Sequence, residues 1–354
     1  MKSFCWLAWI AGGAGVAALG LSAAIYSTSA DLAAAPGSPS QPPARLEDTG
    51  LYLKGQPGVI APKNRAFSPQ YPLWSDGARK ARWVYLPPGA TIDARNPGEW
   101  DFPVGTKFWK EFTFNGHKAE TRFLWRATPA RWVFASYRWN ADGTEATLAA
   151  KEGVPGVADL ENGRTHTIPS TGDCRACHEA SRVEPLGFNA LQLSVDRDPN
   201  AIHGEALAED MLTMKTLVDE GRLRTMPGAK PDVALRIQAA HPDTRAIVGY
   251  LTTNCGVCHQ DGSVAPSLGA SLKHRNVLDA DAIIAALANQ QTSWQVPGTP
   301  DGTTRVIDRA HPEQSALLYR MRTRRPSSQM PPLGTVVADA DAVTRVSKWL
   351  QTMR

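Results

Sequence analysis

Two copies of one five-residue pattern constrain this chain more than any other feature. Residues 174–178 read Cys-Arg-Ala-Cys-His, and residues 255–259 read Cys-Gly-Val-Cys-His. Two thiols three positions apart lie near one edge of a short helical turn, where they can add to the two vinyl groups of a haem. The histidine that follows can bind the iron from one side. The patterns therefore predict two covalently bound haem c groups, attached through Cys174, Cys177, Cys255 and Cys258, with His178 and His259 as iron ligands.

Paired cysteines also occur in redox dithiols and in zinc sites, so these alternatives stay open. The separation of the two pairs does not forbid a zinc site built from four thiolates. Zinc, however, gives no reason for a histidine directly after both pairs, and dithiols outside the cytoplasm tend to oxidise to disulfides. Haem attachment is the preferred interpretation.

The N-terminus predicts export from the cytoplasm. Met1 and Lys2 give a positive start, and residues 4–26 contain no charged side chain. Such a stretch is either a secretory signal, cleaved at the small residues 27–30, or an uncleaved anchor in the inner membrane. Residues 36–45 are rich in proline and serine and read as a tether between residues 1–35 and the rest. Either way, we expect the mature chain in the periplasm.

The following region is rich in tryptophan and alternates apolar with polar residues. The runs 81–86, 106–114 and 131–139 have the period of two that half-buried strands show. Asn115-Gly116 between two such runs is a strong hairpin signal. We therefore expect residues 46–165 to form an antiparallel, sandwich-like β domain. Seven of the eleven tryptophans lie here, at positions 74, 83, 100, 109, 125, 132 and 139. We expect them in the core, with a ligand surface as the alternative; Asp76 is expected in a turn.

The second pattern is framed by helix signals. Residues 243–251 have one-sided apolar spacing, with Asp243 as the predicted N-cap, and lead into Cys255. Met330 begins the stiff sequence Met-Pro-Pro-Leu, which can present a thioether to the second iron. A closing helix is expected over residues 339–353, with an apolar stripe.

The sixth ligand of the first iron is less clear from the sequence. Met226 precedes a proline, as Met330 does, and is the preferred candidate. The other candidates are Met211, Met214 and His203. The spacing of Met211 and Met214 is more typical of core residues on a helix. An iron with an open position is a further alternative.

Together these features resemble known cytochromes. Residues 240–354 resemble a class I cytochrome c domain, and the two CxxCH motifs are similar to those of exported bacterial dihaem c-type cytochromes. Four segments resemble one such family, in which a β region precedes two haem domains: YPLWSDG at 71–77, LPPG at 86–89, FPVGT at 102–106 and MPPL at 330–333. The resemblance implies two haem c groups. The predicted fold class is a multidomain α+β protein: a sandwich-like β domain at 46–165, then two mostly helical cytochrome c-like domains at 166–239 and 240–354.

Electron transfer is the function that these features favour. Iron with histidine and methionine ligands changes charge without binding substrate, and two haems would pass an electron between them. A basic group near Met330 is expected to attract an acidic redox partner; it consists of Arg320, Arg322, Arg324 and Arg325. The net charge of +4 is too small to indicate nucleic-acid binding.

Two other function classes stay open. One is an enzyme, either a dihaem peroxidase with one open iron or a dehydrogenase with a substrate site in the β domain. A peroxidase needs a distal acid or base, for which Glu179, Glu184 and His203 are candidates. The other is a binding module, in which the tryptophan-rich half would bind a polysaccharide or a membrane complex.

Overall fold

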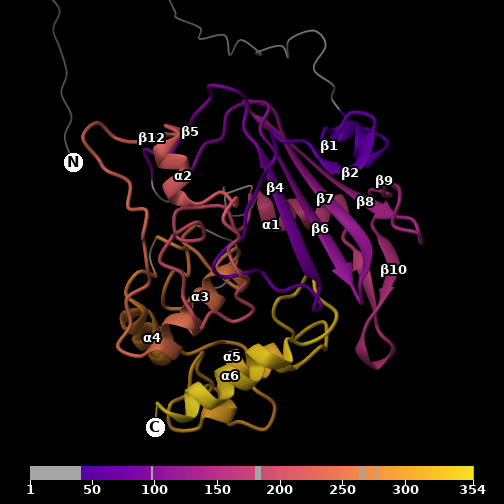
Figure 1. The fold of residues 1–354 in the computed structure, drawn as a ribbon. Coiled ribbons are helices and arrows are strands. Elements are labelled where there is room, and N and C mark those ends of the chain that lie inside the picture. Colours follow the sequence, from indigo (N-terminus) through magenta and orange to yellow (C-terminus); the bar gives the residue numbers. More distant parts are fainter. Residues whose placement is uncertain are drawn as a thin grey trace, which may run out of the picture. The chain divides into compact units, whose positions relative to one another are not determined.

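The computed structural model describes residues 41–96, 99–179, 185–262, 265, 268–275 and 277–353. Residues Ser38–Arg354 form one compact unit. Its main element is a six-stranded antiparallel sheet in the order β3-β4-β6-β7-β8-β9 (Figure 1). These strands are β3 (Arg65–Ala66), β4 (Arg79–Tyr85), β6 (Lys107–Phe114), β7 (His117–Thr128), β8 (Arg131–Trp139) and β9 (Ala146–Leu148).

Smaller elements surround this sheet. Three two-stranded pairs are β1 (Tyr52–Leu53) with β2 (Gln56–Ile60), β10 (Val154–Asp159) with β11 (Thr165–Ile168), and the parallel pair β5 (Ile92–Asp93) with β12 (Leu223–Arg224). The α-helices are α1 (Thr171–His178), α2 (Met214–Asp219), α3 (Pro242–Asn254), α4 (Ala280–Asn289), α5 (Ala316–Arg322) and α6 (Ala340–Gln351). Short 3-10 turns are η1 (Leu46–Thr49), η2 (Glu161–Gly163) and η3 (Pro312–Gln314).

The strands predicted from alternation are confirmed as β4, β6 and β8. The hairpin between β6 and β7 turns at Asn115 and Gly116, whose φ angles of 48° and 84° are those of a tight two-residue turn. Asp76 is also in a turn, as predicted, with a φ of 51°. These local features depend on residue type and spacing alone, which explains why the sequence reveals them.

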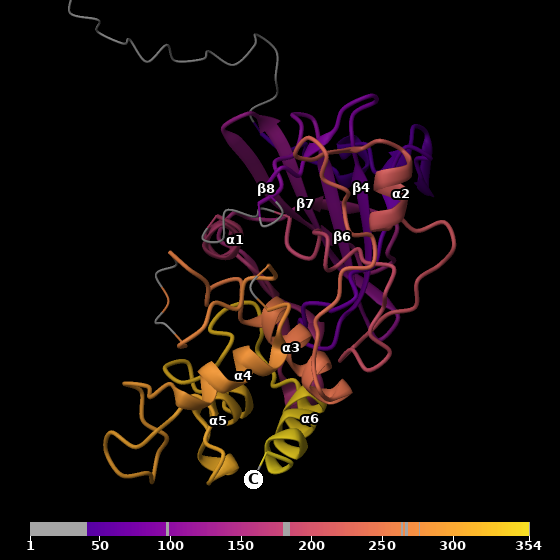
Figure 2. The same ribbon diagram turned by 90° about the vertical axis from the view of Figure 1, so that its left-hand side faces the viewer.

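Both faces of the six-stranded sheet are covered. One face packs Trp109, Phe123 and Tyr137 against η1 and its neighbours. The other face, around Phe108 and Phe134, packs against residues from 188 to 217 (Figure 2). Most of the tryptophans in this region are therefore core or packed on it: Trp100, Trp109, Trp132 and Trp139 are buried, and Trp83 and Trp125 pack against the core.

The predicted fold class is wrong. The tryptophan-rich region has one large sheet and not a sandwich, because its second layer consists of irregular chain with α1 and α2. Residues 166–239 do not form a helical domain, since Phe188, Leu193 and Leu217 complete the core of the sheet. The C-terminal part has short helices joined by long irregular segments, and Tyr71 from the β region lies in its core. The described residues thus do not form two mostly helical cytochrome domains.

Two predicted helices of the C-terminal part are confirmed. Asp339 caps α6, whose Val346, Trp349 and Leu350 are buried. The helix before the second motif is α3, but its N-cap is His241 with Pro242 in the first turn, two residues before the predicted cap. Proline suits this first turn because it needs no backbone donor. α3 packs against α6, and Figure 1 draws it directly above the yellow α6.

None of the helices in the described ranges is long and apolar enough to cross a membrane. The apolar segment 4–26, predicted as a signal or an anchor, lies outside the described residues.

The contact between α3 and Tyr71 gives a test of the fold. An alanine Cβ at Gly249 would lie 2.2 Å from a ring carbon of Tyr71. The ring is buried and its hydroxyl donates to Asp198 at 3.1 Å, so it has little room to move. We expect Gly249→Ala to lower the free energy of unfolding by about 1–3 kcal/mol, measured by urea unfolding.

Gly172→Ala is the control, since its Cβ would make only an ordinary 3.5 Å contact with the Ser170 hydroxyl. In the first turn of α1, this change should be neutral or stabilise by up to about 1 kcal/mol. Equal midpoints for the two variants would contradict the packing of Tyr71 on α3.

Candidate functional site

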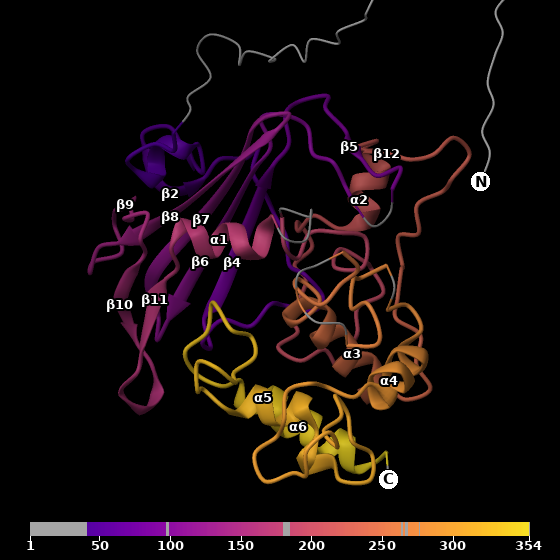
Figure 3. The same cartoon turned by 180° about the vertical axis from the view of Figure 1, so that it is seen from behind.

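The first motif lies on α1, which crosses one face of the six-stranded sheet (Figure 3). Ser170 starts the helix: its hydroxyl accepts from the Asp173 backbone N–H at 3.0 Å, and Asp173 bonds back to the Ser170 N–H. This capping box fixes the turn that carries both thiols. Cys174 packs against the core under the sheet. The His178 ring lies against Phe134 of β8, with 5.2 Å between ring centroids.

The second motif follows directly after α3. The backbone N–H of Cys255 donates to Leu251, and those of Cys258 and His259 donate to the carbonyl of Cys255, so the motif continues as helical turns. At Gly256, an added Cβ would lie 2.3 Å from the Leu272 carbonyl oxygen. The second motif therefore needs glycine at this position, whereas the first carries an exposed Arg175 there.

The structure brings the two motifs together. Burial, and then the charges of Cys258 and Cys174, raise the pKa of the Cys177 thiol to about 11. Cys177 and Cys258 therefore lie close enough for their charges to interact. A second link is the hydrogen bond from the Gln192 side-chain amide to the Thr253 hydroxyl at 2.7 Å, which joins the two motif regions.

The chemistry of the four thiols fits addition to vinyl groups. All four are unpaired cysteines in this structure. Burial and the neighbouring Cys258 raise the pKa of Cys255 to about 12, so this thiol is neutral at physiological pH. A zinc site needs thiolates that converge on one point. Among the described residues, no group of three or more cysteine, histidine or acidic side chains is arranged to hold a metal ion.

The loop of Met330 lies beside the second motif. The Met330 backbone N–H donates to the Arg320 carbonyl at 2.9 Å, and the Arg324 guanidinium donates to the Met330 carbonyl at 3.3 Å. Tyr250 connects this loop to the motif: burial, then Asp339 and Cys255, raise the pKa of its hydroxyl, while Arg324 acts to lower it. Tyr250, one turn before Cys255, thus lies near both the thiol and the loop.

The four arginines near Met330 mostly support this loop. Arg320 stacks over Trp294 at 4.9 Å and donates to the Ser328 carbonyl. Arg322 binds Glu313 at 2.7 Å. Burial lowers the pKa of Arg324, whose contacts are with the loop itself. Arg325 is exposed, as is Arg322.

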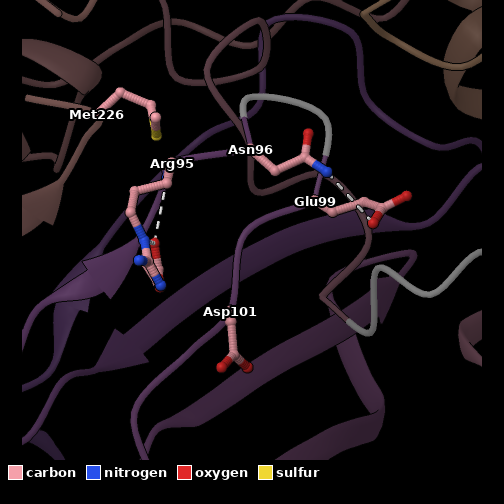
Figure 4. Close-up of a pocket in the computed structure, with 6 residues that line it drawn as sticks. Arg95, Asn96, Glu99, Asp101 and Met226 are labelled. Atoms are coloured by element: carbon pink, nitrogen blue, oxygen red, sulfur yellow. Dashed lines mark hydrogen bonds and ion pairs between the residues drawn. The ribbon is translucent and has the colours of Figure 1, made fainter.

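Met226 lies at the surface, with 55% of its area exposed. It lines a pocket of about 410 Å³ together with five residues of the β5 region: Asp93, Arg95, Asn96, Glu99 and Asp101 (Figure 4). Two residues that line this pocket form ion pairs with residues close to the motifs in sequence or in space. Glu99 binds Lys273, which follows the second motif, and Asp101 binds Arg126, which covers Trp132 two residues before Phe134.

The remaining candidates have other partners. Met214 is buried in the core of the sheet, as expected for helical spacing, and Met211 is half-buried. The Nε2 atom of His203 lies 2.9 Å from both carboxylate oxygens of Asp339. Glu179 is exposed beside Arg175. Glu184 lies outside the described residues.

A buried ionic network beside the site was missed by the sequence analysis. His166 of β11 binds Asp76 at 2.9 Å through Nδ1 and Glu120 at 3.1 Å through Nε2, and Arg122 binds Glu120 at 2.6 Å. Asp76 also accepts the backbone N–H groups of Val336 and Val337, at 2.7 and 3.2 Å, just after the Met330 loop. The network joins the sheet to that loop. The sequence analysis made no prediction for Glu120 or Arg122, because charged residues are mostly exposed and no local signal showed that these two face the interior.

The network predicts a pH dependence of stability. Burial by itself lowers the pKa of His166, but the hydrogen bonds to Asp76 and Glu120 outweigh burial and raise it above the ordinary 6.5. A raised pKa stabilises the fold fully below about pH 6.5, and this contribution is lost as the pH rises through the higher folded-state pKa. We therefore expect the free energy of unfolding to fall over that range.

Urea unfolding at a series of pH values measures this effect. His166→Gln should remove the fall, whereas His117→Gln, at an exposed position of β7, should keep it. Parallel pH curves for the wild type and His166→Gln would rule out the linkage.

Comparisons with known proteins identify no relative for this arrangement. No protein-family model matches the chain, and no curated protein and no solved structure matches it. The chemistry of the site therefore has to be inferred from its own residues and their contacts.

Proposed function

We propose that this chain is an exported dihaem c-type protein that transfers electrons. One haem would be attached at Cys174 and Cys177 with His178 as iron ligand. The other would be attached at Cys255 and Cys258, with ligands His259 and Met330. Haem supplies a one-electron iron couple. The observation that supports this function best is the proximity of Cys177 to Cys258, since it brings the two attachment sites to one place.

Proximity of the thiols matters because each thioether fixes one edge of the group that it carries. Because Cys177 and Cys258 are close enough for their charges to interact, the two groups attached to them would be held with those edges towards one another. Electron exchange between two centres is faster the shorter the gap between their edges. Side-by-side motifs therefore favour exchange within the chain over two independent carriers.

The surrounding residues hold the iron ligands in fixed orientations. Phe134 packs on the His178 ring and restricts its rotation. Arg320 and Arg324 fix the backbone of Met330 on both sides of its peptide. Restrained ligands keep the coordination the same in both oxidation states, so little rearrangement accompanies electron transfer. Met226 as the sixth ligand of the first iron stays a prediction.

The location and the partner are part of the same proposal. Haem c attachment outside the cytoplasm agrees with the N-terminal segment, read as a signal or an inner-membrane anchor in residues 4–26. An acidic redox protein remains the proposed partner. Arg322 and Arg325 are both exposed, and Arg322 is paired with Glu313, so Arg325 is the arginine that we propose would attract it.

The attachment test is a mass measurement on protein from a host that matures c-type cytochromes. We expect the wild type to carry two haems, and the double variants Cys174→Ser/Cys177→Ser and Cys255→Ser/Cys258→Ser to carry one each. Photoreduction of the wild type should show fast redistribution of the electron between two haems, which both double variants lack. Colourless protein with the mass of the polypeptide would contradict the proposal.

Removal of Met330 tests the second iron's sixth ligand. Met330→Ala should open a coordination position, so that the reduced protein gains a large spectral change with carbon monoxide and the oxidised protein loses its iron–thioether charge-transfer band. Met321→Ala is the control, since Met321 is buried in the core of the same region. The same two spectra of Met226→Ala test whether Met226 is the sixth ligand of the first iron. A wild type that already binds carbon monoxide at one haem would favour a dihaem oxidoreductase instead.

A further inference from the structure

Three cations lie side by side on the sheet face under α1. The register of the sheet places Arg82 of β4 opposite Lys110 of β6, and Lys110 opposite Arg122 of β7. Residues directly opposite in antiparallel strands point to the same face, about 5 Å apart. Like charges in this arrangement destabilise a sheet unless anions balance them. Lys80, two residues before Arg82, points to the same face.

The carboxylates of the protein do not neutralise all of these positive charges. Glu205 binds Arg82 at 2.6 and 3.1 Å, and Glu120 binds Arg122 at 2.6 Å. Lys80 donates to the Leu73 carbonyl at 2.6 Å, and no carboxylate among the described residues forms an ion pair with it. For Lys110, the described part of the chain provides no hydrogen bond and no ion pair, only the ring of Phe112 at 5.3 Å.

The two lysines are also half-buried. Burial, then the nearby cations Lys80, Arg82 and Arg122, hold the pKa of Lys110 well below its ordinary value. Burial, followed by Arg82, lowers the pKa of Lys80 to about 7. A native fold rarely leaves a buried cation unpaired, because its desolvation is costly. Two unmatched lysines therefore indicate a ligand with two negative charges.

Arg122, Lys110, Arg82 and Lys80 form a row of cations across the sheet. The position of this cation row identifies the ligand. Arg122 interacts electrostatically with both Cys174 and Cys177, so the row begins beneath the first motif. Lys110 lies one strand further from α1 and Lys80 two strands further, and neighbouring strands are about 4.8 Å apart. Haem carries its two propionate carboxylates on the side opposite its vinyl groups. A haem whose vinyl edge is bonded to α1 can therefore direct its carboxylates over β6 and β4.

We propose that Lys110, with Lys80, binds the propionates of the haem attached at Cys174 and Cys177. This proposal rests on the proposed function. It assigns the large sheet a specific role, which is to supply the counter-charges of the first haem. Binding by lysine also removes the cost of burying the propionates, because each cation compensates one carboxylate.

Resonance Raman spectra of the holoprotein test the proposal directly. Lys110→Met should shift the propionate bending band of one haem and lower the midpoint potential of that haem, since a nearby cation favours the reduced state. Lys110→Arg should keep the wild-type band. Lys107→Met is the matched control: it lies on the same strand but faces the other side, where it donates to the Thr49 carbonyl, and should change neither band nor potential.

The same measurement in the Cys255→Ser/Cys258→Ser background identifies the haem. The band shift should persist there, since only the first haem remains. If the band shift disappears in this background, the assignment to the first haem is wrong. Two haems with unchanged propionate bands in Lys110→Met would overturn the proposal and leave the proposed function intact. Absence of haem would refute the function first. Stabilisation of the wild type, but not of Lys110→Met, by inorganic phosphate would show that the row binds a free anion instead.

Discussion

The Asp76 carboxylate is the interaction on which the arrangement of this protein depends. It is 5% exposed, and it accepts from His166 of the sheet region and from two backbone N–H groups after Met330. A buried carboxylate is stable only when its oxygens are satisfied, so these partners must stay in place together. Through this one side chain the sheet holds the loop that carries the proposed iron ligand.

The rest of the segment 71–77 strengthens that connection. Tyr71 packs on Gly249 in the middle of α3, and the Trp74 backbone N–H donates to the Asn254 side chain, the residue before the second motif. The sheet thus contacts the second motif, while α1 holds the first motif on the same sheet. This explains structurally why the YPLWSDG sequence stands out, although it brings no known chemistry.

The sequence revealed what local rules determine. Alternation gave β4, β6 and β8, Asn115-Gly116 gave the hairpin, and apolar stripes gave α3 and α6. It did not reveal the second layer on the sheet, because residues 185–213 are irregular and have no period to read. It also placed the N-cap of α3 two residues late, since Asp243 is a better cap by type than His241.

In the candidate site, too, local patterns could be predicted from the sequence and long-range contacts could not. The two CxxCH motifs are local patterns, and their chemistry follows from residue type and spacing. The proximity of Cys177 and Cys258, the burial of Glu120 and the half-buried position of Lys110 arise from long-range packing that turns polar strand positions towards the interior.

The shared cores of the sheet and of α3 have a consequence for how the two motif regions are inherited. Because Phe188 and Leu193 complete the sheet's core and Tyr71 completes that of α3, neither motif region forms a separable module. Transfer of one motif region alone into another gene would leave an apolar surface exposed, so we expect the two regions to be inherited together.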